Sequence, residues 1–261
     1  MKTQWLDMLP LWGLLLGGWA VLWLALEGGY RFGRWRHDHR PDEREQPVGA
    51  IVASILGLLA LVLGFTFSLA ASRFDAKRVT LLEEANAIGT TFLRARLLPE
   101  PQAAEMTRLL REYVEVRIEG AHPDRVDTAI QRSEELHELL WVQTQAMAQQ
   151  DARPILTGLF VQSLNEMIDL HAKRVMVGLY SRIPPVLWAG LFGLSLVGMA
   201  SVGYQSGLSA TRRSPAMLGM VVAFSFVMFL IADLDRSQEG LLRVSQQALV
   251  DVQRSMQTSS P

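Results

Sequence analysis

The sequence contains no cysteine, and this absence excludes disulfides, thiolate metal sites and a cysteine nucleophile. It also has no excess of one charge, because 25 Lys and Arg residues are matched by 26 Asp and Glu residues. A chain with this balance has no electrostatic attraction for nucleic acid, which we therefore do not expect as a partner. Phosphate-binding glycine loops and hydrolase or zinc-protease motifs are missing as well. We expect neither an enzyme nor a cofactor.

Long charge-free runs are abundant instead, and apolar residues make up 49% of the chain. The runs cover residues 8–26, 46–72, 183–211 and 214–232. Each is long enough for a helix to cross the roughly 30 Å hydrocarbon core of a bilayer. The first run ends in charged and aromatic residues and lacks a small-residue cleavage site, so we interpret it as a retained span and not as a signal peptide. The sequence predicts four transmembrane helices.

Small residues recur at helical spacing in two of these runs. They are Gly49, Ala53, Gly57, Ala60 and Gly64 in the second run, and Gly190, Gly193 and Gly198 in the third. Strips of this kind let helices approach closely in lipid, where association depends on packing. We expect both strips to lie in contacts between helices.

The stretch between the second and third runs, residues 73–182, is predicted to form a helical bundle outside the lipid. The apolar face of its first helix, which continues from the second span, is Leu81, Ala85, Ile88 and Phe92. Further helices are expected to begin near Pro101, Asp124 and Pro154. Four such helices suffice for an antiparallel bundle. The fold class is therefore an all-α membrane protein with four transmembrane helices and an extramembrane bundle inserted between helices 2 and 3.

These elements divide the chain into two spans with an Arg-rich hairpin, the bundle, two further spans and a polar C-terminal tail. The corresponding residues are 1–72, 73–182, 183–236 and 237–261. The positive charges of the two short hairpins place those hairpins in the cytoplasm and the bundle outside. Counting the Lys and Arg residues that flank the bundle reverses this result, so the sidedness of the bundle stays open.

The end of the second span combines two aromatic and two hydroxyl side chains, Phe65, Thr66, Phe67 and Ser68. One interpretation is an aromatic belt whose hydroxyls bond back to their own helix. The other is a pore constriction, in which the rings narrow the path and the hydroxyls contact a partly dehydrated ion.

Two carboxylates, Asp233 and Asp235, follow the fourth charge-free run directly. Ionisable groups inside a membrane are costly enough to be candidates for a functional role, here in a pore or gate. The alternative is that both lie at the interface, where water solvates them.

Polar residues gather in the bundle near the second and third spans. They are Arg73, Glu83, Glu84, Asn86 and Arg94 on the first helix, and Asn165, Asp169, His171 and Arg174 on the fourth. Because both helices join the membrane directly, we expect the two patches to face each other. Surface salt bridges explain them without a function, whereas the functional alternative is a polar vestibule or ligand pocket.

One pair in the bundle has the spacing of a metal ligand motif. Glu134 and His137 match the E-x-x-H pattern of di-iron bundles, which need two such pairs and two more inward Glu residues. The sequence offers no second pair, so a solvated helix face is the favoured interpretation and no metal site is predicted.

Several of these motifs resemble a known family. Residues 64–68, 73–75 and 83–89 are similar to the signature of the bacterial bestrophin-like membrane family, and residues 113–117, 164–171 and 233–236 to its later landmarks. The resemblance covers most of the chain and keeps the order of the motifs.

The resemblance implies an architecture that matches the one derived above. Bestrophins are homopentameric anion channels with four spans per subunit, a pore lined by the second span, and cytoplasmic helical bulk between spans two and three. The acidic clasp of the calcium-gated members is missing here and the pore neck does not match theirs, so calcium gating and anion selectivity are not carried over.

The leading hypothesis is a homo-oligomeric ion channel or pore in a bacterial plasma membrane, surrounded by lipid, with span two lining the pore. The resemblance implies a pentamer, and the permeant ion is not predicted. The alternative is a membrane-anchored sensor whose bundle binds a ligand and acts through a partner protein.

Overall fold

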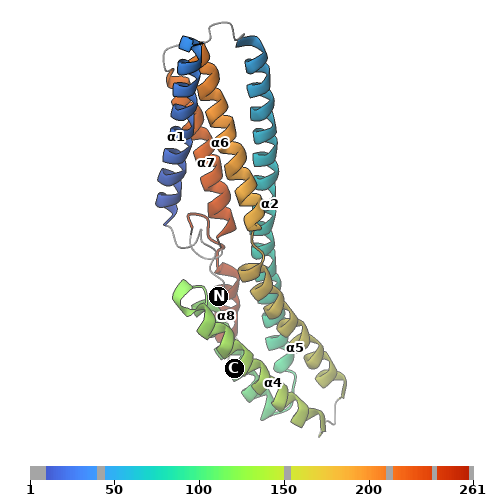
Figure 1. Cartoon of the computed structure of the whole chain (residues 1–261). Coiled ribbons are helices and arrows are strands. Elements are labelled where there is room, and N and C mark those ends of the chain that lie inside the picture. The colour runs from blue at the N-terminus through green and yellow to red at the C-terminus, as the bar shows by residue number, and fades with distance from the viewer. Residues whose placement is uncertain (1–9, 40–44, 150–153, 210–213, 237–239, 259–261) are drawn as a thin grey trace. The chain divides into compact units, whose positions relative to one another are not determined.

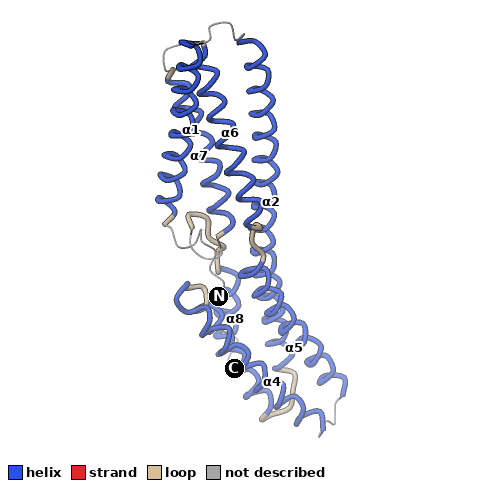
Figure 2. The backbone as a smooth tube through the Cα atoms, viewed as in Figure 1, coloured by secondary structure: helices blue, strands red, loops and turns tan. Residues whose placement is uncertain are grey.

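The computed structural model describes residues 10–39, 45–149, 154–209, 214–236 and 240–258. All regular elements in these ranges are helices (Figure 2). The chain forms two compact units: unit 1 comprises residues 1–72 and 182–236, and unit 2 comprises residues 73–181 and 237–261.

Unit 1 contains the four predicted transmembrane helices. They are α1 (Leu11–His39), the first part of α2 (Glu45–Ala95), α6 (Pro185–Leu208) and α7 (Pro215–Asp235). All four helices are long and apolar enough to cross a membrane, which confirms the prediction of four spans. Within the unit, α1, α6 and α7 run side by side (Figure 1).

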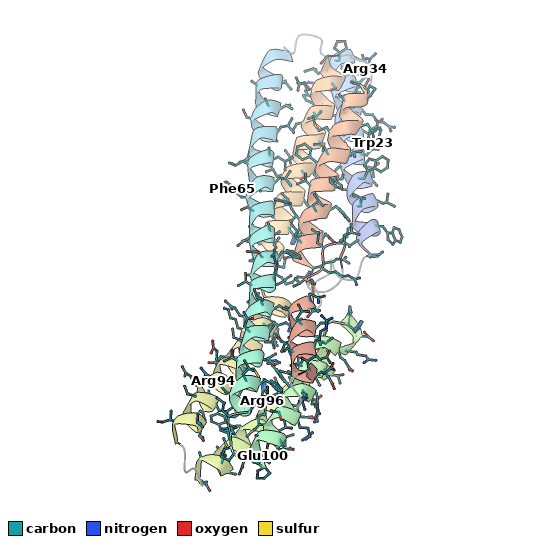
Figure 3. All side chains as sticks on the ribbon, turned by 180° about the vertical axis from the view of Figure 1, so that it is seen from behind. Trp23, Arg34, Phe65, Arg94, Arg96 and Glu100 are labelled. Atoms are coloured by element: carbon teal, nitrogen blue, oxygen red, sulfur yellow. The ribbon has the colours of Figure 1, made fainter. Side chains whose placement is uncertain are left out.

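Helix α1 is longer than the predicted first span. It continues past the charge-free run 8–26 and ends at His39, so that Arg34 lies on the same helix as Trp23 (Figure 3). Arg side chains are unfavourable in lipid but are good helix formers, so the charge pattern marks the end of the span and not the end of the helix.

The closest helix contact of unit 1 joins α1 to α6 through two G-x-x-x-G motifs. The glycines are Gly29 and Gly33 on α1, and Gly203 and Gly207 on α6. A Cβ atom at Gly203 would lie only 2.0 Å from the carbonyl oxygen of Leu26, and each of the other three positions is similarly crowded by backbone. Because side chains do not separate the two backbones, van der Waals packing is maximal at this contact.

The small-residue strips that the sequence suggested behave differently. A Cβ atom at Gly57, Gly64, Gly190 or Gly193 would meet no atom within 4 Å, so at these positions the expected close contact does not form within the chain. At Gly198 the Cβ atom would lie 3.3 Å from the Leu59 side chain, which places α6 against α2. Backbone-to-backbone contact between two helices requires glycines on both facing sides. Among the described residues only α1 and α6 combine glycines in this way.

Unit 2 is a bundle built from the second part of α2 and several shorter helices. These are α3 (Gln102–Glu119), α4 (Val126–Gln149), α5 (Pro154–Val175), a π-helical turn (Met176–Tyr180) and α8 (Gln247–Thr258). The predicted apolar face of α2, Leu81, Ala85, Ile88 and Phe92, is buried, and the last three of these residues belong to the core of unit 2. The prediction that the second span continues as the first bundle helix is confirmed.

Helix α8 lies in the segment that the sequence analysis assigned to a polar tail. Its Leu249 and Met256 side chains are buried in the core of unit 2. The Arg111 guanidinium of α3 also donates a hydrogen bond of 3.2 Å to the Met256 carbonyl oxygen. The C-terminal segment therefore adds a helix to the bundle.

Candidate functional site

The first candidate region is the side of α2 that no other helix of unit 1 covers. The buried face of α2 in this unit consists of Val52, Leu59, Leu63, Thr66 and Ala70. The opposite side, here named the outer face of α2, consists of Ser54, Gly57, Leu61, Gly64, Phe65 and Ser68, all of them exposed. Phe65 points away from the other helices and is 68% exposed (Figure 3).

The four residues predicted at the end of span two lie on different sides of α2. Phe65 and Ser68 belong to the outer face, whereas Thr66 is buried and donates a hydrogen bond of 2.8 Å to the Val62 carbonyl oxygen. Phe67 is 40% exposed. Because side chains two positions apart on an α-helix are rotated by roughly 200°, Phe67 does not point in the direction of Phe65.

The second candidate region is the C-terminal end of α7, where Asp233 and Asp235 are 1% and 2% exposed. The Asp235 carboxylate accepts hydrogen bonds from the Ile183 backbone N–H at 2.8 Å and from Arg182 Nε at 3.3 Å. It thereby fixes the residues just before α6 to the end of α7. The interpretation in which water solvates both carboxylates does not describe this chain, because both are covered by protein.

The third candidate region is a group of polar side chains in the core of unit 2, here named the central charge cluster. Its members are Glu84 of α2, Tyr113 and Arg117 of α3, His137 of α4, and His171 and Arg174 of α5. Arg174 is half-buried and all other members are buried. Four helices of the bundle therefore meet at this cluster.

Glu84 is the centre of the cluster and is completely buried. Its carboxylate accepts hydrogen bonds from Arg117 Nε at 2.9 Å, from the Tyr113 hydroxyl at 3.2 Å and from Arg174 Nη1. Arg174 also donates to the Gln246 side chain at 3.1 Å, just before α8. A buried carboxylate is tolerated only when it is paired and hydrogen-bonded in this way.

The ionisation of Glu84 and Tyr113 follows from these contacts. Burial alone would raise the pKa of Glu84, but the Arg117 charge, the adjacent His171 ring and the Arg174 charge hold that pKa well below its ordinary value. Burial and the adjacent Glu84 carboxylate raise the pKa of the Tyr113 hydroxyl well above its ordinary value. Glu84 is therefore a carboxylate and Tyr113 a neutral hydroxyl at neutral pH.

The two histidines of the cluster touch each other. Their rings meet edge to face with centroids 4.9 Å apart, and the Tyr113 ring lies 5.0 Å from that of His137. Burial, the neighbouring His171 and the Arg117 charge lower the pKa of His137 to about 4. His137 is therefore neutral at neutral pH.

The polar patches predicted on α2 and α5 do face each other, but only part of each enters the cluster. Glu84, His171 and Arg174 lie together in the core. Glu83 instead pairs with Lys173 at 2.8 Å on the surface.

The remaining predicted residues of these patches lie apart from the cluster. Arg94 donates a hydrogen bond of 2.6 Å to the Leu159 carbonyl oxygen, and Figure 3 shows Arg94 near the far end of α2. Asn86, Asn165 and Asp169 are exposed, and Arg73 is half-buried at the start of unit 2. None of these residues contacts Glu84 in the described part of the chain.

Sequence reasoning missed Tyr113 and Arg117 as partners of Glu84, and His137 as a neighbour of His171. The available signal was their position, since Tyr113 and Arg117 are four residues apart on the same buried face of α3 as Leu109 and Leu110. A charged residue on an apolar face requires a partner, and this requirement points to a buried ion pair.

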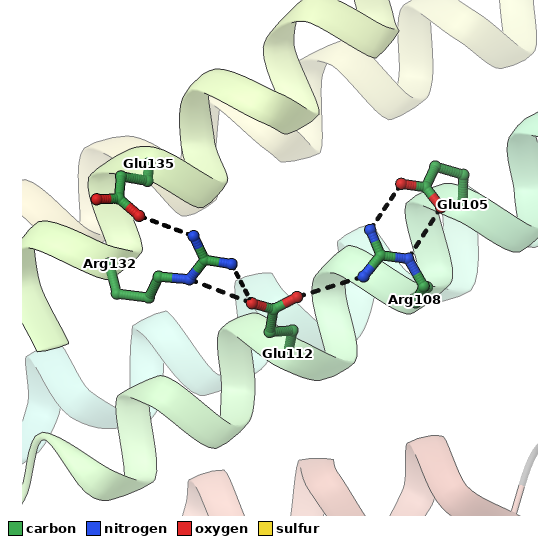
Figure 4. A network of polar contacts seen from close by, with 5 residues as sticks. All are labelled: Glu105, Arg108, Glu112, Arg132 and Glu135. Carbon is green, nitrogen blue, oxygen red and sulfur yellow. Dashed lines mark hydrogen bonds and ion pairs between the residues drawn. The ribbon is translucent and has the colours of Figure 1, made fainter.

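A separate ionic network lies on the surface of unit 2 (Figure 4). Glu112 of α3 accepts hydrogen bonds from Arg132 of α4 and, at 3.3 Å, from Arg108; Arg108 also binds Glu105, and Arg132 binds Glu135. Pairs of this kind are screened by solvent, so the network contributes to the α3–α4 contact without forming a site.

Metal ligands do not converge in the residues that the structure describes, where no three His, Asp or Glu side chains are arranged to hold an ion. His137, which belongs to the E-x-x-H pattern, faces the cluster with its two guanidinium groups. A cation is disfavoured beside these positive charges.

Comparison with solved structures supports the fold. A bacterial bestrophin homologue from Klebsiella pneumoniae is 15% identical with a TM-score of 0.63, and the alignment covers 95% of this chain and 98% of that one. A variant of that homologue gives a TM-score of 0.65 at 14% identity, covering 96% and 99% of the two chains. At this identity the similarity establishes a shared fold.

No curated protein matches the chain. The Bestrophin-like domain matches residues 19–249, which cover most of both units and all three candidate regions. The chain therefore belongs to the Bestrophin-like family.

Proposed function

We propose that the protein is a homo-oligomeric ion channel or pore of the bacterial plasma membrane and that the outer face of α2 lines its conducting path. The observation that carries the proposal is the composition of this exposed face. Ser68 and Ser54 place hydroxyls on it, that of Ser54 donating to the Ala50 carbonyl oxygen at 2.9 Å, and Gly57 and Gly64 leave their backbone open. Hydroxyls and bare backbone gain little from lipid tails, whereas they suit water, ions or a second helix.

Unit 2 offers independent support for an oligomer. Its part of α2 exposes Val79, Leu82 and Leu93 on one side of the helix, and Leu97 follows just after the helix end. Exposed apolar side chains gathered in water mark a surface that another protein covers. A neighbouring copy of the chain is the partner that the family implies, and the family resemblance favours a pentamer.

The sensor alternative has less support. The residues that would form a ligand pocket in the bundle include Glu84, His171 and Arg174, and these bind one another and Arg117. A ligand would have to displace these buried ion pairs, which is costly.

The test is ion flux from the purified oligomer in liposomes. We expect measurable flux, and we expect Phe65→Ala to change it because the ring lies on the outer face. Phe67→Ala is expected to have a smaller effect. The control is Phe226→Ala, which removes a ring that is 50% exposed on α7, and whose flux should equal that of the unmodified protein.

Two outcomes would contradict the proposal. Absence of flux from a correctly assembled oligomer would exclude a pore. Equal flux from Phe65→Ala and Phe226→Ala would instead favour the aromatic-belt interpretation of this segment.

A further inference from the structure

The central charge cluster contains two imidazole nitrogens that the protein leaves without a hydrogen-bond partner. The Nε2 atoms of His137 and His171 are both buried, and neither is bonded within the described part of the chain. Buried polar atoms are nearly always bonded, so such a pair requires a physical explanation.

The hydrogen bonds of Tyr113 define the state of the His171 ring. The Tyr113 hydroxyl donates its single proton to Glu84, so towards His171 Nδ1, at 3.2 Å, its oxygen can only accept. Nδ1 of His171 therefore carries the hydrogen in the neutral ring. Nε2 is left as a bare lone pair, ready to accept a proton.

The charges around this lone pair make a protonated ring unfavourable in the folded bundle. Facing the two rings are Glu84 of α2, Tyr113 and Arg117 of α3, and Arg174 of α5, with the uncharged Gln246 beside Arg174. One carboxylate therefore faces two guanidinium groups, so one positive charge is uncompensated before either ring takes up a proton. A proton on either ring adds a second uncompensated positive charge to a core that excludes water.

We propose that His137 and His171 form a proton-binding site in the core of unit 2, and that proton uptake on acidification loosens the contact of α4 with α3 and α5. A proton on one ring repels a proton on the other at a centroid distance of 4.9 Å, so the closed bundle takes up at most one proton and the loosened bundle takes up two.

The direction of the effect follows from linkage. The pKa of His137 in the folded chain, about 4, lies below its ordinary value of 6.5, so the unfolded or opened state binds the proton more readily. The stability that neutral His137 provides is fully present above about pH 6.5 and is lost progressively as the pH falls towards about 4.

Hydrogen exchange of the full chain in lipid nanodiscs tests this inference, which does not rest on channel activity. We expect the opening of α4, corrected for the intrinsic exchange rate, to increase by up to about tenfold per pH unit below about pH 6. Peptides of α1 and α6 in unit 1 should show no such change. A pH-independent opening of α4 in the unmodified chain would overturn the proposal.

Histidine substitutions show which residues cause the pH dependence of α4 opening. Combining His137→Phe with His171→Gln removes both proton acceptors and keeps an aromatic ring against Tyr113, so the pH dependence should disappear. His122→Gln changes an exposed histidine and should retain the full dependence. Retention of the dependence in the double variant, or its loss in His122→Gln, would contradict the assignment to the buried pair. If the double variant does not fold, the pH dependence of α4 opening in the unmodified chain and in His122→Gln still tests the proposal.

Discussion

The two units of this chain solve the problem of packing helices in different ways. In unit 1, α1 and α6 touch backbone to backbone through four glycines. In unit 2, four helices surround a buried carboxylate, two guanidinium groups and two imidazoles. Lipid tails provide no hydrophobic drive for helix association, so close van der Waals contact dominates in unit 1. Unit 2 has an apolar core as well, and its ion pairs fix which side chains meet at its centre.

The largest expected effect comes from breaking the centre of unit 2. Glu84→Gln leaves the buried Arg117 and the half-buried Arg174 without a carboxylate, and we expect it to destabilise unit 2 by about 3–5 kcal/mol. Hydrogen exchange that compares peptides of the two units measures this loss. Peptides of α3 and α5 should exchange much faster, whereas those of α1 and α6 should not.

The adjacent residue provides the matched control. Glu83 pairs with Lys173 on the surface, where both side chains are about half exposed. Glu83→Gln should therefore change the stability of unit 2 by less than about 1 kcal/mol. Equal effects of the two substitutions would show that burial of the ion pair does not matter.

A somewhat smaller effect is expected from the glycine contact of unit 1. Gly203→Ala places a methyl group where the Leu26 carbonyl oxygen is 2.0 Å away, so α1 and α6 must separate. We expect a loss of about 1–3 kcal/mol, measured as a lower midpoint of thermal unfolding in detergent. Gly193→Ala, on the same helix with open space around the new atom, should leave the midpoint unchanged. An unchanged midpoint for Gly203→Ala would show that close backbone contact does not stabilise unit 1, and the proposed difference between the two units would be wrong.

The smallest effect belongs to the surface network of unit 2. Glu112→Gln weakens the link from α3 to Arg132 but leaves both guanidinium groups in water. We expect exchange of α3 and α4 peptides to remain close to that of the unmodified chain. Destabilisation as large as that of Glu84→Gln would place the main ionic contribution on the surface of the bundle.

The fold was largely predictable because its signals are periodic. Charge-free runs identified the four spans, and the spacing of Leu81, Ala85, Ile88 and Phe92 identified the buried face of α2. The end of α1 was missed because arginines end a span without ending a helix. Helix α8 was missed because only a few apolar side chains, among them Leu249 and Met256, anchor it in a polar segment.

The candidate regions were less predictable, since they depend on which helices meet. Glu84, His171 and Arg174 could be named from their proximity to the spans, but their joint contact with Arg117 required the packing of α3. Asp235 looked like an interfacial charge because sequence does not reveal that the Ile183 N–H lies beside it. The direction of Phe65 likewise depends on which side of α2 the other helices occupy.

The most direct test of the proposed pore is thiol accessibility along α2, because the unmodified chain contains no cysteine. Single substitutions Ser54→Cys and Ser68→Cys place a thiol on the outer face, whereas Val222→Cys places one on an exposed part of α7. In liposomes, a charged water-soluble thiol reagent should modify the two α2 variants and reduce their ion flux, and should leave Val222→Cys unmodified. Unmodified thiols and unchanged flux in both α2 variants would contradict a conducting path along α2.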